Sequence, residues 1–409
     1  MSNAWYTICI NGKRNGFFKS QRGVKQGDPI LPSLFIIASE VLSRLLNKLY
    51  EDKKFNGFNM PTNGPSINHL SYADDIIIFS SGKSYTLMKI MKCLKDYQEN
   101  SGQMINEGKS CFLMDDSISS KRVNIVAGIL NFQRANFPIT YLGCPIFVGR
   151  KNIQYFSFMA TKILQKLDSW QCKTLSNGGK IILIKHVLSA IPVHLLSICM
   201  PPKTIFKQIE SIFANLFGDK GDDEGGIGVR SLQEIAESFS AKLWWTFRTA
   251  ESLWTKFMKA KYSMRIHPMA RKWNYAHSHT WRRLMKIRDK VDHLIHWKIN
   301  KGNSNIWWDK WMGTGKLARL NTNTSINSPL HQYIHHKEWD TNKLLKNFPL
   351  EMVNNIQNIK IHSLDHRDIP IWTPTCDGKF TCKSAWNAMR EPNHTSLVWS
   401  SGDPGTPVP

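Results

Sequence analysis

The sequence has no long apolar run, no export signal and no paired cysteines. No segment approaches the about 18 consecutive apolar residues that a membrane-spanning helix needs, and the N-terminus lacks the charged-then-apolar order of a signal peptide. Eight cysteines are scattered without a C-x-x-C pair, so we expect reduced thiols and no disulfide framework. These absences predict an intracellular protein of the nucleus or cytoplasm that is not secreted and has no membrane partner.

Acidic residues are also scarce. The chain has 31 Asp and Glu against 54 Lys and Arg, which gives a formal net charge of +23. An excess of this size favours a polyanionic partner, and nucleic acid is the expected one. With 409 residues, 42% of them hydrophobic, the chain is long and apolar enough for two or three globular domains.

Two adjacent carboxylates, Asp74 and Asp75, lie between short runs of β-branched and aromatic residues. The runs 67–72 and 76–79 predict two strands joined by a tight connection, with the carboxylates at the tip. Because successive side chains of a strand point to opposite faces, we rank Asp74 above Asp75 as a metal ligand. Aspartate is also an ordinary turn residue, so the pair alone leaves both a turn and a metal site open.

A glycine-rich stretch at 22–29, RGVKQGDP, precedes a helical pattern that extends to Leu49. Glycine lets the backbone approach a ligand closely, and the helix N-terminus that follows favours phosphate. Gly23, Gln26 and Gly27 are therefore candidates for contacts to nucleotide or template. Gly-Asp-Pro is also common turn chemistry, so this stretch is weak evidence by itself.

The remainder of the chain shows helical periodicity and a basic region. Residues 87–97 have apolar residues at helical spacing, and 151–217 predict further helices with an interruption at Pro192. Residues 242–301 hold 15 Lys or Arg against three acidic residues, and nine tryptophans fall between Trp244 and Trp311. Basic and aromatic residues together suit single-stranded nucleic acid, although we expect most of these tryptophans to pack in a core.

Taken together, these stretches resemble the palm of a reverse transcriptase, specifically that of plant non-LTR (LINE-type) retrotransposons. The matching segments occur in the family's order: RGVKQGDP at 22–29, YADD at 72–75, SGQMIN at 101–106, YLGCP at 141–145, LSNGGK at 175–180 and GGIGV at 225–229. The resemblance implies an α+β fold, with a partial polymerase palm of antiparallel sheet and packed helices. A helical thumb and a basic, Trp-rich C-terminal region are expected to follow.

The same resemblance divides the chain into segments. It implies a partial palm at 1–115, the end of the palm with the helical thumb at 116–217, a linker at 218–228 and the basic region at 229–370. Residues 371–409 resemble the truncated start of a zinc-binding module followed by a disordered tail. The cysteine and histidine cluster expected further along that module is not present in the sequence.

The activity implied by the resemblance is RNA-directed DNA synthesis. Such enzymes join dNTPs to the 3′-hydroxyl of a DNA primer on an RNA template, using two divalent cations, Mg²⁺ or Mn²⁺. The metal ligands and catalytic carboxylates implied are Asp74 and Asp75, with Lys109 as proton donor or charge stabiliser. The remaining residues implied are Tyr72 and Ala73 at the substrate, and Tyr141, Leu142 and Gly143 in a primer grip.

In the family, the hairpin aspartates work with another carboxylate on a strand upstream of the glycine-rich loop. This chain starts after the point where that strand is expected, so the sequence predicts a polypeptide truncated at the N-terminus, and at the C-terminus as well. We expect the chain to be inactive alone. The alternative is a non-catalytic nucleic-acid-binding remnant of a retroelement, and the oligomeric state does not follow from the sequence.

Overall fold

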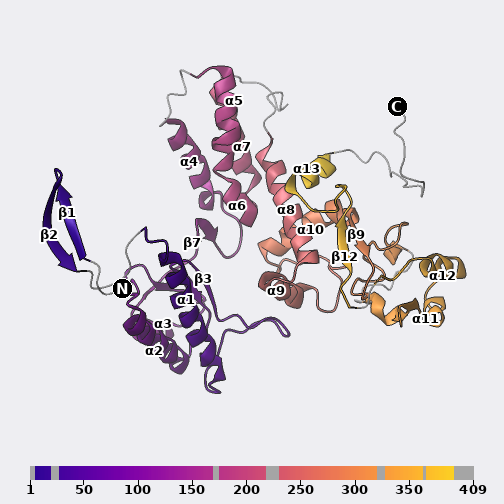
Figure 1. Cartoon of the computed structure of the whole chain (residues 1–409), viewed down its shortest axis with the longest axis horizontal. Helices are drawn as coiled ribbons and strands as arrows, with labels where there is room; N and C mark the ends of the chain where they lie inside the picture. The colour runs from indigo at the N-terminus through magenta and orange to yellow at the C-terminus, as the bar shows by residue number, and fades with distance from the viewer. Residues whose placement is uncertain are drawn as a thin grey trace. The chain divides into compact units, whose positions relative to one another are not determined.

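The computed structural model describes residues 5–19, 27–168, 175–217, 230–319, 328–362 and 365–390. The chain divides into two compact units, Met1–Ile139 and Thr140–Pro409, and Figure 1 labels their α-helices and some of their strands. Both units mix helices with strands, which agrees with the α+β class. Within the described ranges every sheet has two strands, and no helix is long and apolar enough to cross a membrane.

The first unit combines helices with short hairpins. β1 and β2 pair antiparallel around Asn11 and Gly12, whose φ angles of 48° and 78° suit a tight hairpin turn. The elements of this unit are β1 (Trp5–Ile10), β2 (Lys13–Lys19), α1 (Leu31–Lys48), η1 (Leu49–Glu51), β3 (His69–Tyr72), β4 (Asp75–Ile78), α2 (Ser84–Ser101), β5 (Cys111–Phe112), α3 (Ser120–Leu130), β6 (Gln133–Arg134) and the start of β7 (Ile139–Tyr141).

The core of the first unit forms where α2 packs against α1 and α3. Ile90, Leu94 and Tyr97 of α2 are buried with Leu42 and Leu46 of α1. Each such side chain contributes about 1.5–3 kcal/mol relative to an exposed one. The helix predicted over residues 87–97 is therefore confirmed, and its apolar face supports the strands that follow α1.

The second unit is longer and holds most of the helices. Its helices and strands are β8 (Cys144–Ile146), η2 (Ile153–Tyr155), α4 (Ser157–Asp168), α5 (Asn177–His186), η4 (Leu188–Ala190), α6 (Val193–Ile198), α7 (Lys203–Phe217), α8 (Leu232–Thr249), α9 (Leu253–Tyr262), α10 (His279–Val291), η5 (Asp292–Leu294), β9 (Ile295–Lys298), η6 (Leu317–Arg319), η7 (Leu330–Tyr333), β10 (Ile334–His335), β11 (Glu338–Trp339), α11 (Thr341–Leu345), α12 (Leu350–Gln357), β12 (Ile369–Trp372) and α13 (Cys382–Arg390).

Helices α4 to α7 share one apolar core. Phe156, Ile163, Leu196 and Ile205 are fully buried within it. Pro192 is the N-cap residue of α6, and the helical stretch beginning with α5 is interrupted before it, as the sequence predicts, because proline lacks the N–H that an interior helical position needs.

A second core forms around α8, which packs against α6, α7, α10 and α13. Trp244, Trp281 and Trp372 are fully buried there, so the expectation that most tryptophans pack in the core is confirmed. Ser278 caps α10 by accepting a hydrogen bond from the backbone N–H of Trp281 at 3.3 Å. Strand β12 pairs antiparallel with β9, so residues 369–372 are part of the same packed body.

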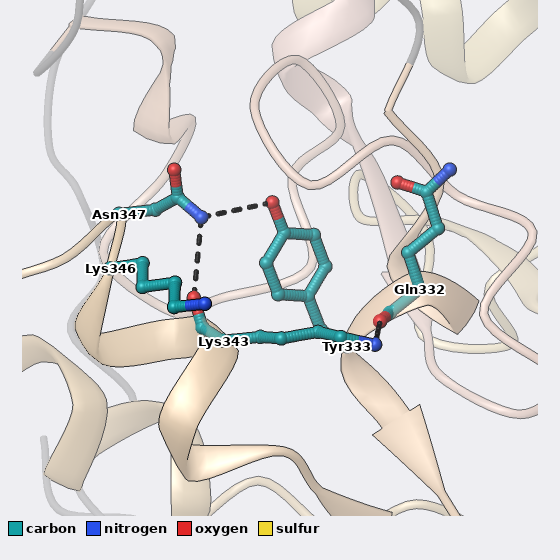
Figure 2. Close-up of a pocket in the computed structure, with 5 residues that line it drawn as sticks. All are labelled: Gln332, Tyr333, Lys343, Lys346 and Asn347. Carbon is teal, nitrogen blue, oxygen red and sulfur yellow. Dashed lines mark hydrogen bonds between the residues drawn. The ribbon is translucent and has the colours of Figure 1, made fainter.

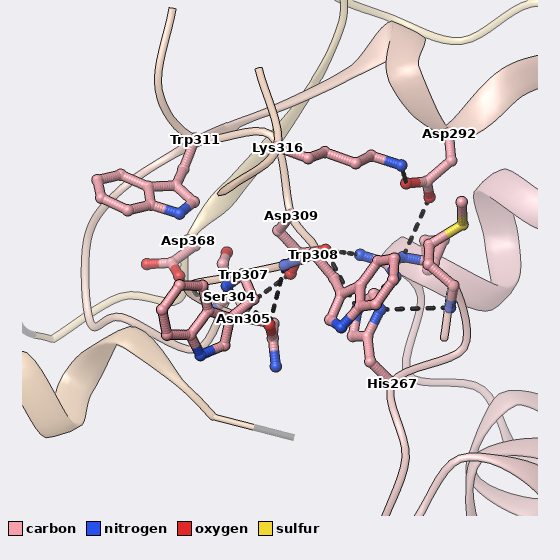
Figure 3. A network of polar contacts seen from close by, with 12 residues as sticks. His267, Asp292, Ser304, Asn305, Trp307, Trp308, Asp309, Trp311, Lys316 and Asp368 are labelled. Atoms are coloured by element: carbon pink, nitrogen blue, oxygen red, sulfur yellow. Dashed lines mark hydrogen bonds and ion pairs between the residues drawn. The ribbon is translucent and has the colours of Figure 1, made fainter. Parts of the chain in front are cut away.

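A buried ion network connects α8 with the segments that follow α10 (Figure 3). The guanidinium of Arg248 donates to Asp309, and its Nε lies 3.7 Å from Asp292. Lys316 donates to the second oxygen of Asp292 at 2.7 Å, while His267 lies 3.3 Å from Asp309. All of these side chains except Lys316 are nearly inaccessible to solvent, so each charge depends on its neighbours for stabilisation.

The electrostatics of this network follow from burial and charge pairing. Burial raises the pKa of Asp309 and of Asp292, but the positive charge of Arg248 together with the other partners, His267 and Asn305 for Asp309 and Lys316 for Asp292, holds both pKa values below their ordinary range. Burial lowers the pKa of His267, and the charge of Arg248 adds to this effect. The network is therefore expected to hold two ionised carboxylates and a neutral imidazole at neutral pH.

The lowered pKa of His267 makes stability pH-dependent. As pH falls below about 6.5 the unfolded chain takes up a proton that the folded ring resists, so stability is lost through this window. We expect the free energy of unfolding to fall by at most about 1.4 kcal/mol per pH unit there, measured by urea unfolding. The variant His267→Gln is expected to flatten this dependence, and an unchanged slope would contradict the assignment.

Candidate functional site

The predicted hairpin of the two carboxylates is confirmed. β3 and β4 pair antiparallel with Tyr72 opposite Asp75, so Ala73 and Asp74 form a two-residue turn. Ala73 has a φ of 50°, a left-handed conformation that costs a residue with a Cβ roughly 1–2 kcal/mol. Such strain is kept where the surroundings determine the turn, and here it places Asp74 at the tip and Asp75 at the first position of β4.

The hairpin is held against α1 by a chain of polar side chains. Nε2 of His69 lies 3.0 Å from the hydroxyl of Ser43, and its Nδ1 lies 2.7 Å from the side-chain oxygen of Asn68. Asn68 in turn donates to the side-chain oxygen of Asn47 at 2.8 Å. Burial lowers the pKa of His69, so a neutral ring fits this position. Sequence reasoning missed these anchors because they join residues more than one element apart.

Both carboxylates are exposed to solvent. In the described part of the chain, neither accepts a hydrogen bond nor forms an ion pair, and no group of three His, Cys, Asp or Glu side chains is placed to hold a metal ion. Carboxylate oxygens are nevertheless the hard ligands that Mg²⁺ takes, and Mg²⁺ keeps several waters or substrate oxygens in its shell. Asp74 and Asp75 thus fit a magnesium site in the type of donor that they supply.

The other residues predicted for the first unit are placed separately. Lys109 lies in a turn where its backbone N–H donates to both oxygens of Asn106 at 3.1 Å, and its side chain is exposed. Among the described contacts, no hydrogen bond or ion pair joins Lys109 to either aspartate. Gly27 has a φ of 88° with open space around it, so this position does require glycine. Gly23 and Gln26 lie outside the described residues.

The predicted primer-grip segment forms a second tight hairpin. Strands β7 and β8 pair across Leu142 and Gly143, whose φ angles are 48° and 75°, as a type I′ turn requires. Nε2 of His194 on α6 lies 3.0 Å from the carbonyl oxygen of Leu142, and Tyr141 is half-buried. His194 is a positioning residue that the sequence did not reveal, since it is 52 residues away from the turn.

A surface pocket of about 330 Å³ lies elsewhere in the second unit (Figure 2). Its walls include Tyr333 and Asn347, joined by a hydrogen bond of 3.3 Å, and Lys343, whose ammonium donates to the carbonyl of Gln332 at 3.1 Å. None of the residues that the sequence assigns to catalysis or binding lines this pocket. The candidate site therefore remains the exposed hairpin of Asp74 and Asp75.

Two proteins of Arabidopsis thaliana are similar to parts of this chain. An Arabidopsis thaliana protein named "Putative ribonuclease H protein" is 26% identical over 279 residues, which is 60% of this chain and 44% of the relative. An "Uncharacterized mitochondrial protein" of Arabidopsis thaliana is 46% identical over 77 residues, 17% of this chain and 63% of the relative. The chain thus spans less than two thirds of the length of either relative.

Residues 1–146 match the family described as reverse transcriptase (RNA-dependent DNA polymerase). This range contains the glycine-rich stretch, the carboxylate hairpin and both strands of the primer-grip-like hairpin. The order of these features along the chain is the one that the sequence resemblance implies. Residues 1–146, with Asp74 and Asp75 exposed on their hairpin, are thus similar to the reverse transcriptase family.

Proposed function

We propose that this chain is a fragment of the reverse transcriptase of a plant LINE-type retrotransposon, and that it supplies the metal-binding hairpin of the polymerase palm. The observation that supports this most directly is the β3–β4 turn, which exposes two adjacent carboxylates within the segment that matches the family. Its substrates are dNTPs and a DNA primer paired with an RNA template. Asp74 and Asp75 would hold the metal, Mg²⁺ or Mn²⁺, which would supply activation of the 3′-hydroxyl and stabilisation of the leaving pyrophosphate.

Each residue of the site has a role in this proposal. Asp74, at the tip, supplies the principal metal ligand, and Asp75 supports it from the first position of β4. Tyr72 and Ala73 line the approach of the nucleotide, since the Tyr72 side chain is 65% exposed beside the turn. The ammonium of Lys109, exposed on its own turn, stabilises charge on the leaving phosphate or donates a proton to it.

The primer-grip turn has a separate role in the second unit. Its backbone conformation, fixed by two left-handed residues and by the contact from His194, presents Leu142 and Gly143 to a primer backbone. Tyr141, the last residue of β7 before the turn, is half-buried. We propose that this segment positions the primer end, and that residues 371–409 are the truncated start of a zinc-binding module.

We further propose that the polypeptide alone does not complete the reaction. Two carboxylates leave most of the coordination shell of a metal pair to water and substrate, and their mutual repulsion is unrelieved by any cation among the described contacts. A further carboxylate is required for tight binding. The second candidate function, a nucleic-acid-binding remnant without catalysis, is favoured by the formal charge of +23.

Metal binding tests the site without relying on activity. Terbium ions, which take the same oxygen ligands as Mg²⁺, are expected to bind weakly and to luminesce through the adjacent Tyr72 ring. Asp74→Asn is expected to weaken this binding about tenfold or more, because a triply charged terbium ion and a carboxylate 4 Å apart attract by about 3 kcal/mol even in bulk water. Asp75→Asn is expected to have a smaller effect.

The matched control is Asp96→Asn, which removes an exposed carboxylate on α2 and is expected to leave the luminescence unchanged. Primer extension on an RNA template with Mg²⁺ is the second readout, and the chain alone is expected to show none. If the unaltered chain does extend the primer and Asp74→Asn extends it equally well, the site assignment is wrong.

A further inference from the structure

The loop that follows β8 contacts the first residue of α10 through Phe147 and Gly149. Nε2 of His279 lies 2.7 Å from the carbonyl oxygen of Gly149, and the rings of Phe147 and His279 have centroids 5.2 Å apart. His279 is the first residue of α10. These contacts bring the two cationic residues that follow Gly149, Arg150 and Lys151, to the first turns of that helix.

The region is rich in positive charge and lacks a carboxylate partner. Arg282 and Lys286 are exposed and lie one helical turn apart on α10. The ammonium of Lys151 donates to the carbonyl of Met200. In the described residues, no ion pair with an acidic side chain involves Lys151, Arg282 or Lys286, and none involves Arg150. Lys151, Arg282 and Lys286 thus lie close enough to interact electrostatically, and Arg150 directly precedes Lys151 in the chain.

Burial and the neighbouring positive charges both lower the pKa of the Lys151 ammonium. Burial is the main cause that lowers its pKa to about 8, and the positive charges of Arg283, Lys286 and Arg282 lower it further. Arg283 has a structural role, since its buried guanidinium donates hydrogen bonds to the carbonyls of Leu196 and Ala236. An anion bound near Lys151 would favour its charged form.

The same surface continues to Trp273 and the exposed ring of Tyr275. The guanidinium of Arg282 lies 4.9 Å from the ring centroid of Trp273, and the rings of Trp273 and Tyr275 are 4.5 Å apart with an interplanar angle of 66°. The Tyr275 side chain is 90% exposed. Trp273 is half-buried and thereby supports Tyr275. The ring of Tyr275 is packed against Trp273 on one side and is otherwise exposed to solvent. A planar group can stack on such a ring.

We propose that this surface, made of Arg150, Lys151, Trp273, Tyr275, Arg282 and Lys286, binds single-stranded nucleic acid. The cations neutralise successive phosphates, and the free face of Tyr275 stacks on an unpaired base. A duplex offers phosphates but keeps its bases stacked on one another, so it cannot use Tyr275. All six residues lie after the segment that matches the polymerase family, which ends at residue 146. The proposed surface therefore goes beyond the polymerase proposal.

Fluorescence anisotropy of the full chain with a labelled single-stranded RNA tests this surface. Tyr275→Ala is expected to weaken binding about tenfold, within the range that one stacked base contributes, whereas Tyr275→Phe is expected to keep the affinity. Lys286→Gln is expected to lower the slope of log affinity against log salt by about 0.7, the value for one phosphate contact of a single strand.

Two controls separate this surface from general charge and from the metal site. Lys360→Gln removes an exposed lysine of the same unit and is expected to leave the affinity nearly unchanged. Terbium luminescence at the β3–β4 hairpin is expected to be the same in Tyr275→Ala as in the unaltered chain, so either proposal can fail alone. Equal affinity for a duplex, combined with no effect of Tyr275→Ala, would overturn the assignment.

Discussion

Replacement of Arg248 by methionine is expected to destabilise the second unit by about 3–5 kcal/mol, the range for breaking a buried ion pair from one side. The guanidinium contacts both Asp309 and Asp292, and each of these carboxylates is almost completely buried. Without Arg248, the buried carboxylate of Asp309 loses the guanidinium that donates to it. Urea unfolding followed by tryptophan fluorescence measures the loss, because buried Trp244 reports directly on this core.

A matched control for this variant is Arg44→Met on α1. Arg44 pairs with Glu40 at 2.8 Å, but both side chains are mostly exposed, so its loss is expected to change stability by no more than about 0.5 kcal/mol. Arg248→Lys is expected to be intermediate, since an ammonium lacks the planar fork that reaches two carboxylates. If Arg248→Met unfolds at the same urea concentration as the unaltered chain, the network does not stabilise the fold.

The parts of the fold that were predicted correctly depend on local patterns. The hairpin of Asp74 follows from two short strand-like runs with a polar pair between them, and α2 follows from apolar residues at helical spacing. The break at Pro192 follows from the chemistry of one residue. In each case the signal lies within about ten residues of the feature that it predicts.

The parts that were not predicted depend on residues far apart in the chain. Arg248 and Asp309 are separated by 61 positions, and nothing in either local sequence indicates that they meet. The same holds for His194 and the turn at Leu142, and a left-handed leucine is itself an unusual choice that β-turn statistics do not favour. The pairing of β12 with β9 is equally non-local, and the sequence did not indicate it, whereas it did indicate the local pairing of β3 with β4.

The candidate site shows the same division. Sequence reasoning located Asp74 and Asp75 and ranked the residue at the tip first, and the structure places that residue in the turn. It did not identify the polar chain from His69 to Asn47 that fixes the hairpin on α1. It attributed the aromatic content of the basic region mainly to packing, which is correct for Trp244. The structure separates Tyr275 from the packed tryptophans, because a ring that is 90% exposed to solvent has no packing role in the core.

Asp368→Ala is expected to destabilise the second unit by about 3 kcal/mol or more. Its carboxylate accepts hydrogen bonds from three backbone N–H groups, those of Asn300 and Gly302 at 2.8 Å and that of Ser304 at 2.6 Å. Asp368 is only 5% exposed, and each buried N–H left without an acceptor costs about 1–3 kcal/mol. Urea unfolding gives the change in free energy, and hydrogen exchange of these amides is expected to accelerate.

The conservative variant Asp368→Asn distinguishes hydrogen bonding from packing. Its single carbonyl oxygen can still accept from two of the three N–H groups, while its amide nitrogen faces the third, so an intermediate loss is expected. Asp289→Ala, which removes a carboxylate that is 71% exposed on α10, is the matched control and is expected to be nearly neutral. Because the cost arises from unpaired backbone N–H groups, Asp368→Asn must retain more stability than Asp368→Ala, and the reverse order would disprove the role assigned to this carboxylate.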